Sequence, residues 1–543
     1  MHSPAAALAW EFWGRYRWEL TAFGVFALAY AVATATITPA DPEKFAALGS
    51  FVFAMGLLHL VVVFSHGAEV RVETAESGFP ARAFALPVRT SVLVGWPMLQ
   101  AAAAAVLAWV VWDRFVLRPC GVETPFWWAP MLAALVVAVQ ALVWVPVGLP
   151  WLRLPVAVIV LTGLVRAPAL LALAGERFTD PAVENAILSL FAAVVIPVAF
   201  LLARAGVSRA RRGDSPDWWR AVRSPGRADA AYRERPPFAS AMRALVWYEW
   251  RLRAHGFPVL VVFTVAALMA SAVLLVDDDG GRTGFSATFL IIPFVLAAFC
   301  GSFLGATGDS HRSWVVIPAF AATRPVSNAA VVAAKVTAAA LAAAVAWAAA
   351  LALTAGWLAF TGGVRDLPRA WDQAAAHLGP VRAAALAAVL AVGPAVLIWR
   401  ILIGDIWVML TGRPWVSHAQ AVVLVPLASL AAHEWSLGKD DPARYARVAD
   451  ALPWVAAAAA AVKVLVAVWL LRLLVRRGEI TGRTVGWLVG GWVLAAAGLF
   501  ALLAWLAPPG LVPAYALAAG VVLFVPLARP ALAPLALAWN RHR

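Results

Sequence analysis

The chain has 543 residues, of which 63% are hydrophobic and 13% are charged, and its formal net charge is +14. This composition excludes a soluble protein. Many apolar runs reach 18 residues, the length that a helix needs to cross about 30 Å of hydrocarbon. Backbone groups in lipid must be hydrogen-bonded internally, and the dyad alternation of a membrane barrel is not seen. We therefore expect an all-α polytopic membrane protein.

The apolar runs predict about 14 transmembrane helices. With the N-terminus inside, Lys and Arg concentrate in the inner segments and Asp and Glu in the outer loops, as the positive-inside bias requires. This topology predicts a multi-pass protein of the cell (inner) membrane with both termini cytoplasmic. The predicted spans are 20–38, 46–66, 91–112, 127–148, 156–174, 186–203, 257–276, 285–306, 329–360, 382–403, 417–433, 453–473, 485–507 and 512–528.

The cysteine content, the N-terminal residues and the charge distribution disfavour several functional classes. The only cysteines are Cys120 and Cys300, so neither a disulfide framework nor a thiolate zinc site is expected. The N-terminal residues lack the short apolar core and the cleavage site of a secretory signal. Because the topology accounts for the basic excess, no nucleic-acid partner is expected. We predict no catalytic residue, no metal and no cofactor.

Two amphipathic segments, 5–18 and 241–254, are predicted to lie as helices on the inner membrane surface. Each carries a Glu and an Arg four residues apart, Glu11 with Arg15 and Glu249 with Arg253. Pairs at this spacing meet on one helix face.

These pairs belong to an internal repeat with a constant offset of 238 residues. Glu249 follows Glu11 by this number, Pro318 follows Pro80, and Pro325 follows Pro87. Trp109 and Trp347 also match after similar Ala-rich runs. One register without gaps therefore covers about a hundred residues, which predicts two homologous six-helix halves followed by a C-terminal helical hairpin.

This repeat gives the predicted domain organisation. A basic cytoplasmic linker rich in Arg, Ser and Pro separates the halves, and its charge is expected to attract it to anionic lipid headgroups. The predicted parts are a first six-helix half at 1–203, the linker at 204–240, a second half at 241–477, and an extra transmembrane hairpin with a basic tail at 478–543.

The polar inner loops between spans two and three, 67–90 and 305–328, stand out because they are long and repeated. Each has a proline at the start of a predicted short helix and a second proline that ends it before the next span. One copy alone would be read as a proline-punctuated return to the bilayer; two copies in register favour a functional element. Its candidate residues are Pro80, Phe84, Leu86, Pro87, Val88, Arg89, Pro318, Phe320, Arg324, Pro325, Val326 and Ser327.

The surface helix, the polar loop ending in Leu86-Pro87-Val88-Arg89-Thr90 and the apolar helix that follows resemble the permeases of ABC-2 type exporters. The second copy, Arg324-Pro325-Val326-Ser327-Asn328, carries Lys335 nine residues after Val326. The resemblance covers roughly 5–110 and 241–350. It implies two permeases fused in one chain, with each loop acting as a coupling helix that seats in an ATPase subunit. Arg324 replaces the family's usual Leu, and Pro97 stands where the second copy has Lys335.

The chain carries no G-x-x-x-x-G-K-[ST] motif. If it is a transport subunit, the ABC-type ATPase subunits come in trans and the chain itself is not an enzyme. Their closure would tilt one half against the other through the two loops. Membrane lipids are the other expected partners, and the transported substrate is not readable.

Ionisable groups within spans are candidate functional sites. Arg166 and Lys463 lie mid-span and form a candidate intramembrane polar site, whereas Lys335 is expected to snorkel to the inner interface. Arg166 is open to two interpretations, an internal ion pair or contact with an anionic headgroup.

Two other functions stay open. One is an ion-driven transporter or lipid flippase, for which helix breaks at Pro146 and Pro394 are suggestive. The other is a polytopic membrane glycosyltransferase that uses the acidic residues Asp277, Asp278 and Asp279 beside span seven.

Overall fold

The computed structural model describes most of the chain in helices, and no strand occurs among the residues it describes. Single residues between 6 and 65 are also described, together with 153, 156 and 416. The continuous described ranges are 77–146, 181–214, 238–275, 279–305, 326–413, 442–507 and 512–541.

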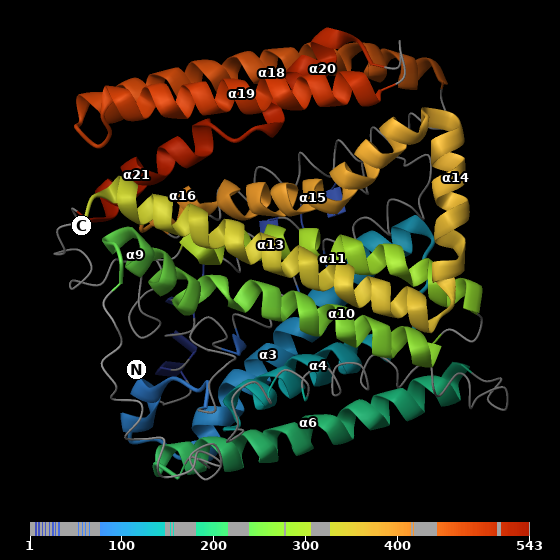
Figure 1. The fold of residues 1–543 in the computed structure, drawn as a ribbon. Helices are drawn as coiled ribbons and strands as arrows, with labels where there is room; N and C mark the ends of the chain where they lie inside the picture. The colour runs from blue at the N-terminus through green and yellow to red at the C-terminus, as the bar shows by residue number, and fades with distance from the viewer. Residues whose placement is uncertain are drawn as a thin grey trace, which may run out of the picture. The chain divides into compact units, whose positions relative to one another are not determined.

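The chain divides into two compact units, Met1–Arg235 with His418–Tyr445 and Pro236–Ser417 with Ala446–Arg543. The first division falls within the predicted linker. In the first unit, α3, α4 and α6 pack against one another in pairs (Figure 1). Its elements are the 3-10 helix η2 (Ala81–Ala85), α3 (Thr90–Trp112), the π-helix η3 (Asp113–Leu117), the 3-10 helix η4 (Arg118–Cys120), α4 (Trp128–Trp144) and α6 (Pro181–Arg211).

In the second unit, α10, α11, α13 and α15 form the central bundle, and α14 runs steeply across the ends of α13 and α15 (Figure 1). Its elements are α9 (Ala241–Glu249), the π-helix η5 (Trp250–Ala254), α10 (Gly256–Leu275), α11 (Asp279–Gly305), α13 (Asn328–Phe360), the 3-10 helix η6 (Gly363–Asp366), α14 (Leu367–Leu378), α15 (Pro380–Gly404), α16 (Ile406–Leu410), α18 (Pro442–Arg476, whose first residues cluster with the first unit), α19 (Gly482–Leu506), α20 (Ala514–Phe524) and α21 (Ala528–Arg541).

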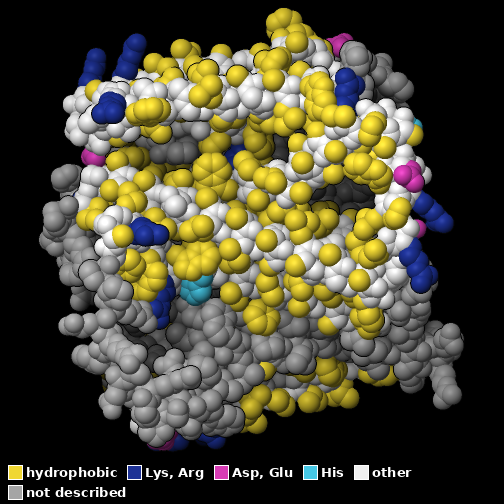
Figure 2. Space-filling model, viewed as in Figure 1, with side chains coloured by type: hydrophobic (Ala, Val, Ile, Leu, Met, Phe, Trp, Pro, Cys, Tyr) yellow, Lys and Arg dark blue, Asp and Glu magenta, His cyan; other side chains and the backbone are white. Residues whose placement is uncertain are grey.

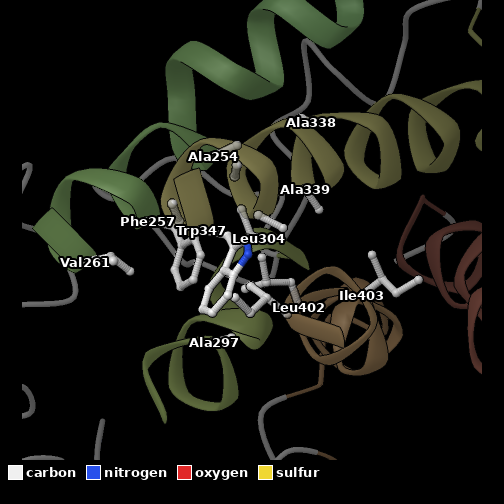
Figure 3. Close-up of a cluster of buried hydrophobic side chains, with 14 of the residues drawn as sticks. Ala254, Phe257, Val261, Ala297, Leu304, Ala338, Ala339, Trp347, Leu402 and Ile403 are labelled. Atoms are coloured by element: carbon white, nitrogen blue, oxygen red, sulfur yellow. The ribbon is translucent and has the colours of Figure 1, made fainter. Parts of the chain in front are cut away.

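The core of this bundle contains a buried tryptophan, and one of its close helix contacts requires glycine. Trp347 of α13 lies within the core, near Phe257 of α10 and Leu402 of α15 (Figure 3). Its indole Nε1 donates to the carbonyl of Ala391 at 2.7 Å, which satisfies the one polar atom of this ring. At the contact between α11 and α16, a Cβ on Gly305 would overlap the backbone of Ile406, so this position requires glycine.

Among the described residues, seven helices are long and apolar enough to cross a membrane. Three shorter apolar helices accompany them: Trp128–Trp144, Ser286–Ala298 and Ala514–Phe524. Ten of the predicted spans therefore coincide with apolar helices, while 20–38, 46–66, 156–174 and 417–433 lie wholly or mostly outside the described residues. Figure 2 shows that the helix sides on one face carry mainly hydrophobic side chains, with most Lys and Arg toward the margins.

The structure differs from several of the expected boundaries. Helix α6 continues to Arg211, eight residues beyond its predicted span. The segment 241–254 is helical and runs through the π-helix into the next span as one helix, Ala241–Ala270. Helix α20 has only 11 residues, about 16 Å at 1.5 Å per residue, which is too short to cross a bilayer alone.

The region predicted as a basic tail contains α21, which packs against α16 and α13. Its residues Ala533, Leu535, Ala536 and Leu537 are buried. A Cβ on Gly412, which has φ +70°, would lie 2.6 Å from Oδ1 of Asn540. The end of the described chain therefore belongs to the core of the second unit.

Candidate functional site

The first inner loop contains the predicted short helix, formed as the 3-10 helix Ala81–Ala85 after Pro80. The proline supplies a fixed φ, −58° here, at the N-cap. Leu86 and Arg89 then have extended backbone, and α3 begins at Thr90. We define the first junction as residues 77–90 together with Arg211.

The loop is attached to the C-terminal end of α4, whose last carbonyl groups have no partner within the helix. The amide of Gly78 donates to the carbonyl of Val143 at 3.0 Å, and the hydroxyl of Ser77 donates to the carbonyl of Trp144. Phe79 is 5% exposed and packs edge-on against the ring of Trp144, with centroids 5.0 Å apart. These contacts fix the start of the junction on the apolar helix α4.

Arg211 holds the other end of the loop. Its guanidinium donates to the carbonyl oxygens of Phe84 at 3.1 Å, Leu86 at 2.6 Å and Val88 at 2.7 Å. It also lies 3.4 Å from Oγ1 of Thr90. The planar fork of arginine suits this set of diverging acceptors, which a lysine could not reach simultaneously. Arg211 was expected to be part of the lipid-attracted linker, but it ends α6 and binds the loop.

The predicted coupling residues of this copy separate into two sides. Pro80 is buried, and Phe84, Leu86 and Val88 are half-buried. Pro87 and Arg89 are exposed, as is Ala85. The loop therefore presents a small outward surface on a backbone that is fixed from behind.

In the second copy, Pro318, Phe320, Arg324 and Pro325 lie outside the described residues. Val326 is half-buried, and Ser327 caps α13 by accepting from the amide of Ala330 at 3.2 Å.

We define the second junction as Val326–Asn328 with Glu479. The amide group of Asn328 donates to both carboxylate oxygens of Glu479, at 3.0 and 3.2 Å. Glu479 follows α18 in sequence, in the turn before α19. Its carboxylate faces the N-terminal end of α13, where a negative charge is favourable.

The surface-helix residue Glu249 takes part in a buried charge cluster. It is 8% exposed, and its Oε2 lies 2.9 Å from Nζ of Lys335 and 3.8 Å from Nη1 of Arg253. Lys335 is 3% exposed and also donates to the carbonyl of Leu304 at 3.1 Å. The prediction that Lys335 snorkels is therefore wrong, because its amine finds a carboxylate and a helix-end carbonyl inside the bundle.

Of the remaining predicted residues, Glu11, Arg15, Arg166, Asp277 and Asp278 lie outside the described residues. Asp279 is the first residue of α11.

Lys463 is half-buried and donates to the carbonyls of Val522, Leu523 and Val525 at 2.6 to 3.0 Å. Arg400 reaches the same Leu523 carbonyl at 3.1 Å. Both cations hold the C-terminal end of the short helix α20, where positive charge is favourable.

Sequence reasoning missed the partners that hold the junctions, Arg211 and Glu479. Both come within eight residues after the sixth predicted span of a half, and this shared position was the available signal. Comparison with known family models, with curated proteins and with solved structures finds no match to this chain.

Proposed function

We propose that the chain is the membrane-spanning subunit of an ATP-driven exporter of the ABC-2 type, two permease-like halves in one polypeptide. Its inner loops 67–90 and 305–328 dock ABC-type ATPase subunits supplied in trans, in the cell membrane. The observation that carries the proposal is the first junction, an ordered loop with an exposed tip and a backbone bound to α4 and α6.

A coupling element has to transmit displacement without deforming. In the first junction, the contacts of Gly78 and Arg211 fix both ends of the loop to helix ends. A push on Pro87 or Arg89 would therefore move α4, α6 and the start of α3 as one body. A loop that merely returned to the bilayer would not need three backbone carbonyls held by one guanidinium.

The second junction supports the same role through different contacts. Asn328 begins α13 and is bound by Glu479, and Lys335 further along α13 is bound to Glu249 of α9. Movement at the start of α13 would thus reach both the segment 241–254 and the turn between α18 and α19. This is how a rigid-body motion spreads through packed helices.

The experiment is purification of the full chain with its native subunits in mild detergent, followed by vanadate-sensitive ATP hydrolysis of the assembly. The test variants are Arg89→Glu and Pro87→Gly, at exposed positions of the first junction. The matched control is Arg365→Glu, at an exposed position of η6. We expect the test variants to lose the ATP-hydrolysing subunit and the control to retain it.

Fold integrity is checked by size-exclusion elution and thermal unfolding, because a misfolded variant would lose every partner. If folded wild type co-purifies with no ATP-hydrolysing subunit, the proposal fails. If that subunit remains bound equally to the Arg89→Glu, Pro87→Gly and control variants, the loop is not its docking surface.

A further inference from the structure

Helix α14 (Leu367–Leu378) has an amphipathic surface without a buried residue. Its apolar positions recur at the spacing of one helix face, and its charged and amide side chains lie on the opposite face. The apolar stripe consists of Leu367, Ala370, Trp371, Ala374, Ala375 and Leu378. The polar face carries Arg369, Asp372, Gln373 and His377.

The stripe is directed toward α15. Among the residues of α14, only Ala374, Ala375 and Leu378 are half-buried, and all three belong to the stripe. Helix α14 packs against α15 and η6. The same stripe continues to Leu367 and Trp371, which are 53% and 43% exposed. The apolar face that packs against α15 therefore continues into two large side chains that are exposed.

The flanking helices place α14 at the membrane boundary. It joins α13 to α15, and both of these belong to the seven helices long and apolar enough to cross a membrane. Helix α13 has 33 residues, about 50 Å, so it extends beyond about 30 Å of hydrocarbon. Figure 1 shows α14 running steeply across their ends. If α13 and α15 cross the membrane, this is the direction of the bilayer surface.

We propose that α14 is an interfacial anchor whose stripe, led by Leu367 and Trp371, is immersed in the lipid at the surface where α13 ends. Because α15 extends into the bilayer from the end of α14, the side of α14 that faces α15 is also the hydrocarbon side. A Trp at this level suits the headgroup boundary, where its ring is apolar and its N–H remains wet.

The charges of this segment indicate which lipid it accepts. Arg365 and Arg369 are balanced by Asp366 and Asp372, and Arg369 lies 3.6 Å from Asp366. With no excess of positive charge, attraction to anionic headgroups contributes little and apolar burial drives the contact. We therefore assign zwitterionic lipid as sufficient for immersion. This distinguishes α14 from a basic amphipathic helix, which needs anionic lipid.

The test uses the full chain in phosphatidylcholine nanodiscs, with the two native cysteines replaced by alanine. A nitroxide is attached in turn through Trp371→Cys and through the matched variants Asp372→Cys and Gln373→Cys on the opposite face. Power-saturation measurements compare collisions with oxygen, which is enriched in lipid, and with a water-soluble nickel chelate. We expect position 371 to favour oxygen, and positions 372 and 373 to favour the chelate.

Equal chelate access at positions 371 and 372 would place α14 in water and overturn the proposal. Poor access of both reagents to position 371 would mean that protein covers the stripe, which also overturns it. In nanodiscs that contain phosphatidylglycerol, we expect unchanged depth. Immersion that appears only with anionic lipid would overturn the assignment of zwitterionic lipid. None of these outcomes depends on an ATPase, so the anchor can fail or hold independently of the proposed function.

Discussion

The two junctions occupy equivalent places in the repeat but are held by opposite charges. Thr90 and Asn328, the first residues of α3 and α13, are separated by the same 238 residues as the repeated motifs. Thr90 lies 3.4 Å from the guanidinium of Arg211, whereas Asn328 donates to the carboxylate of Glu479. In each half the partner comes within eight residues after the sixth predicted span.

The physical problem differs at the two places. In the first junction the extended loop exposes carbonyl oxygens, so a cation with several donors satisfies it. In the second, the hydroxyl of Ser327 accepts from the backbone amide of Ala330, and the carboxylate of Glu479 accepts from the side chain of Asn328 beside the positive end of the helix dipole. In both halves, the start of the third predicted span is bound to a residue that follows the sixth. The bond is made by a cation in the first half and by a carboxylate in the second.

A second difference lies at the end of predicted span two. In the first half, neutral side chains of α4 satisfy its carbonyls: Gln140 donates to Phe64 at 2.9 Å and Trp144 donates to Ser65 at 2.8 Å. In the second half, Lys335 of α13 donates to Leu304. A buried cation requires a counter-charge, which Glu249 supplies. The first half has Pro97 at the position of Lys335, so this cation has no counterpart there.

The largest effect is expected from Lys335→Met, which removes the buried cation that binds the carbonyl of Leu304. Glu249 would remain buried beside Arg253 at 3.8 Å without its close partner. Breaking a buried pair from one side costs about 3–5 kcal/mol, measured as the free energy of unfolding in detergent.

Replacing both partners, as Lys335→Met with Glu249→Gln, should recover much of that loss. Double-variant stability no better than that of Lys335→Met alone would show that the pair does not act as a unit.

Arg211→Gln should have the next largest effect, at the first junction. The variant loses charge-assisted bonds to three carbonyls, a cost of about 2–3 kcal/mol in local stability. Amide hydrogen exchange of residues 83–93 should accelerate. Arg209→Gln, an exposed position on the same helix, is the control and should leave this exchange unchanged; equal acceleration in the control would contradict the assigned role.

Glu479→Gln tests the opposite junction and should cost about 1 kcal/mol. The amide still reaches Asn328, but the negative charge at the start of α13 is lost. Faster exchange is expected at residues 330–332 and not at 83–93, so each junction responds only to its own partner. Asp450→Asn, at an exposed position of α18, is the neutralisation control. A change confined to the first junction would refute the comparison.

Effects of this size or smaller are expected at the helix caps. Ser327→Ala should lower the stability of the start of α13 by about 1 kcal/mol, because its hydroxyl caps the amide of Ala330. Arg89 occupies the N-cap of α3 without a side-chain cap, so Arg89→Ser should stabilise that helix end by about 0.5–1 kcal/mol. Thermal unfolding of both variants checks the opposite signs.

The helical class and the positions of most apolar helices could be read from the sequence, because span length and apolar runs are local properties. The short helix after Pro80 was also predictable, since two prolines bound it. The snorkelling of Lys335 was predicted wrongly because Glu249 lies 86 residues away in the chain. A long side chain near a span end has the same local pattern whether it reaches water or a buried carboxylate.

By itself, the sequence determined an all-helical chain with spans of membrane length and a repeated, proline-bounded loop. Only the tertiary structure decided what holds that loop, because Arg211 lies more than 120 residues from the carbonyls it binds. It also decided that residues 528–541 form a core helix, α21. Apolar burial depends on which faces meet across the bundle, and no local pattern of Ala, Leu and Pro specifies that partner.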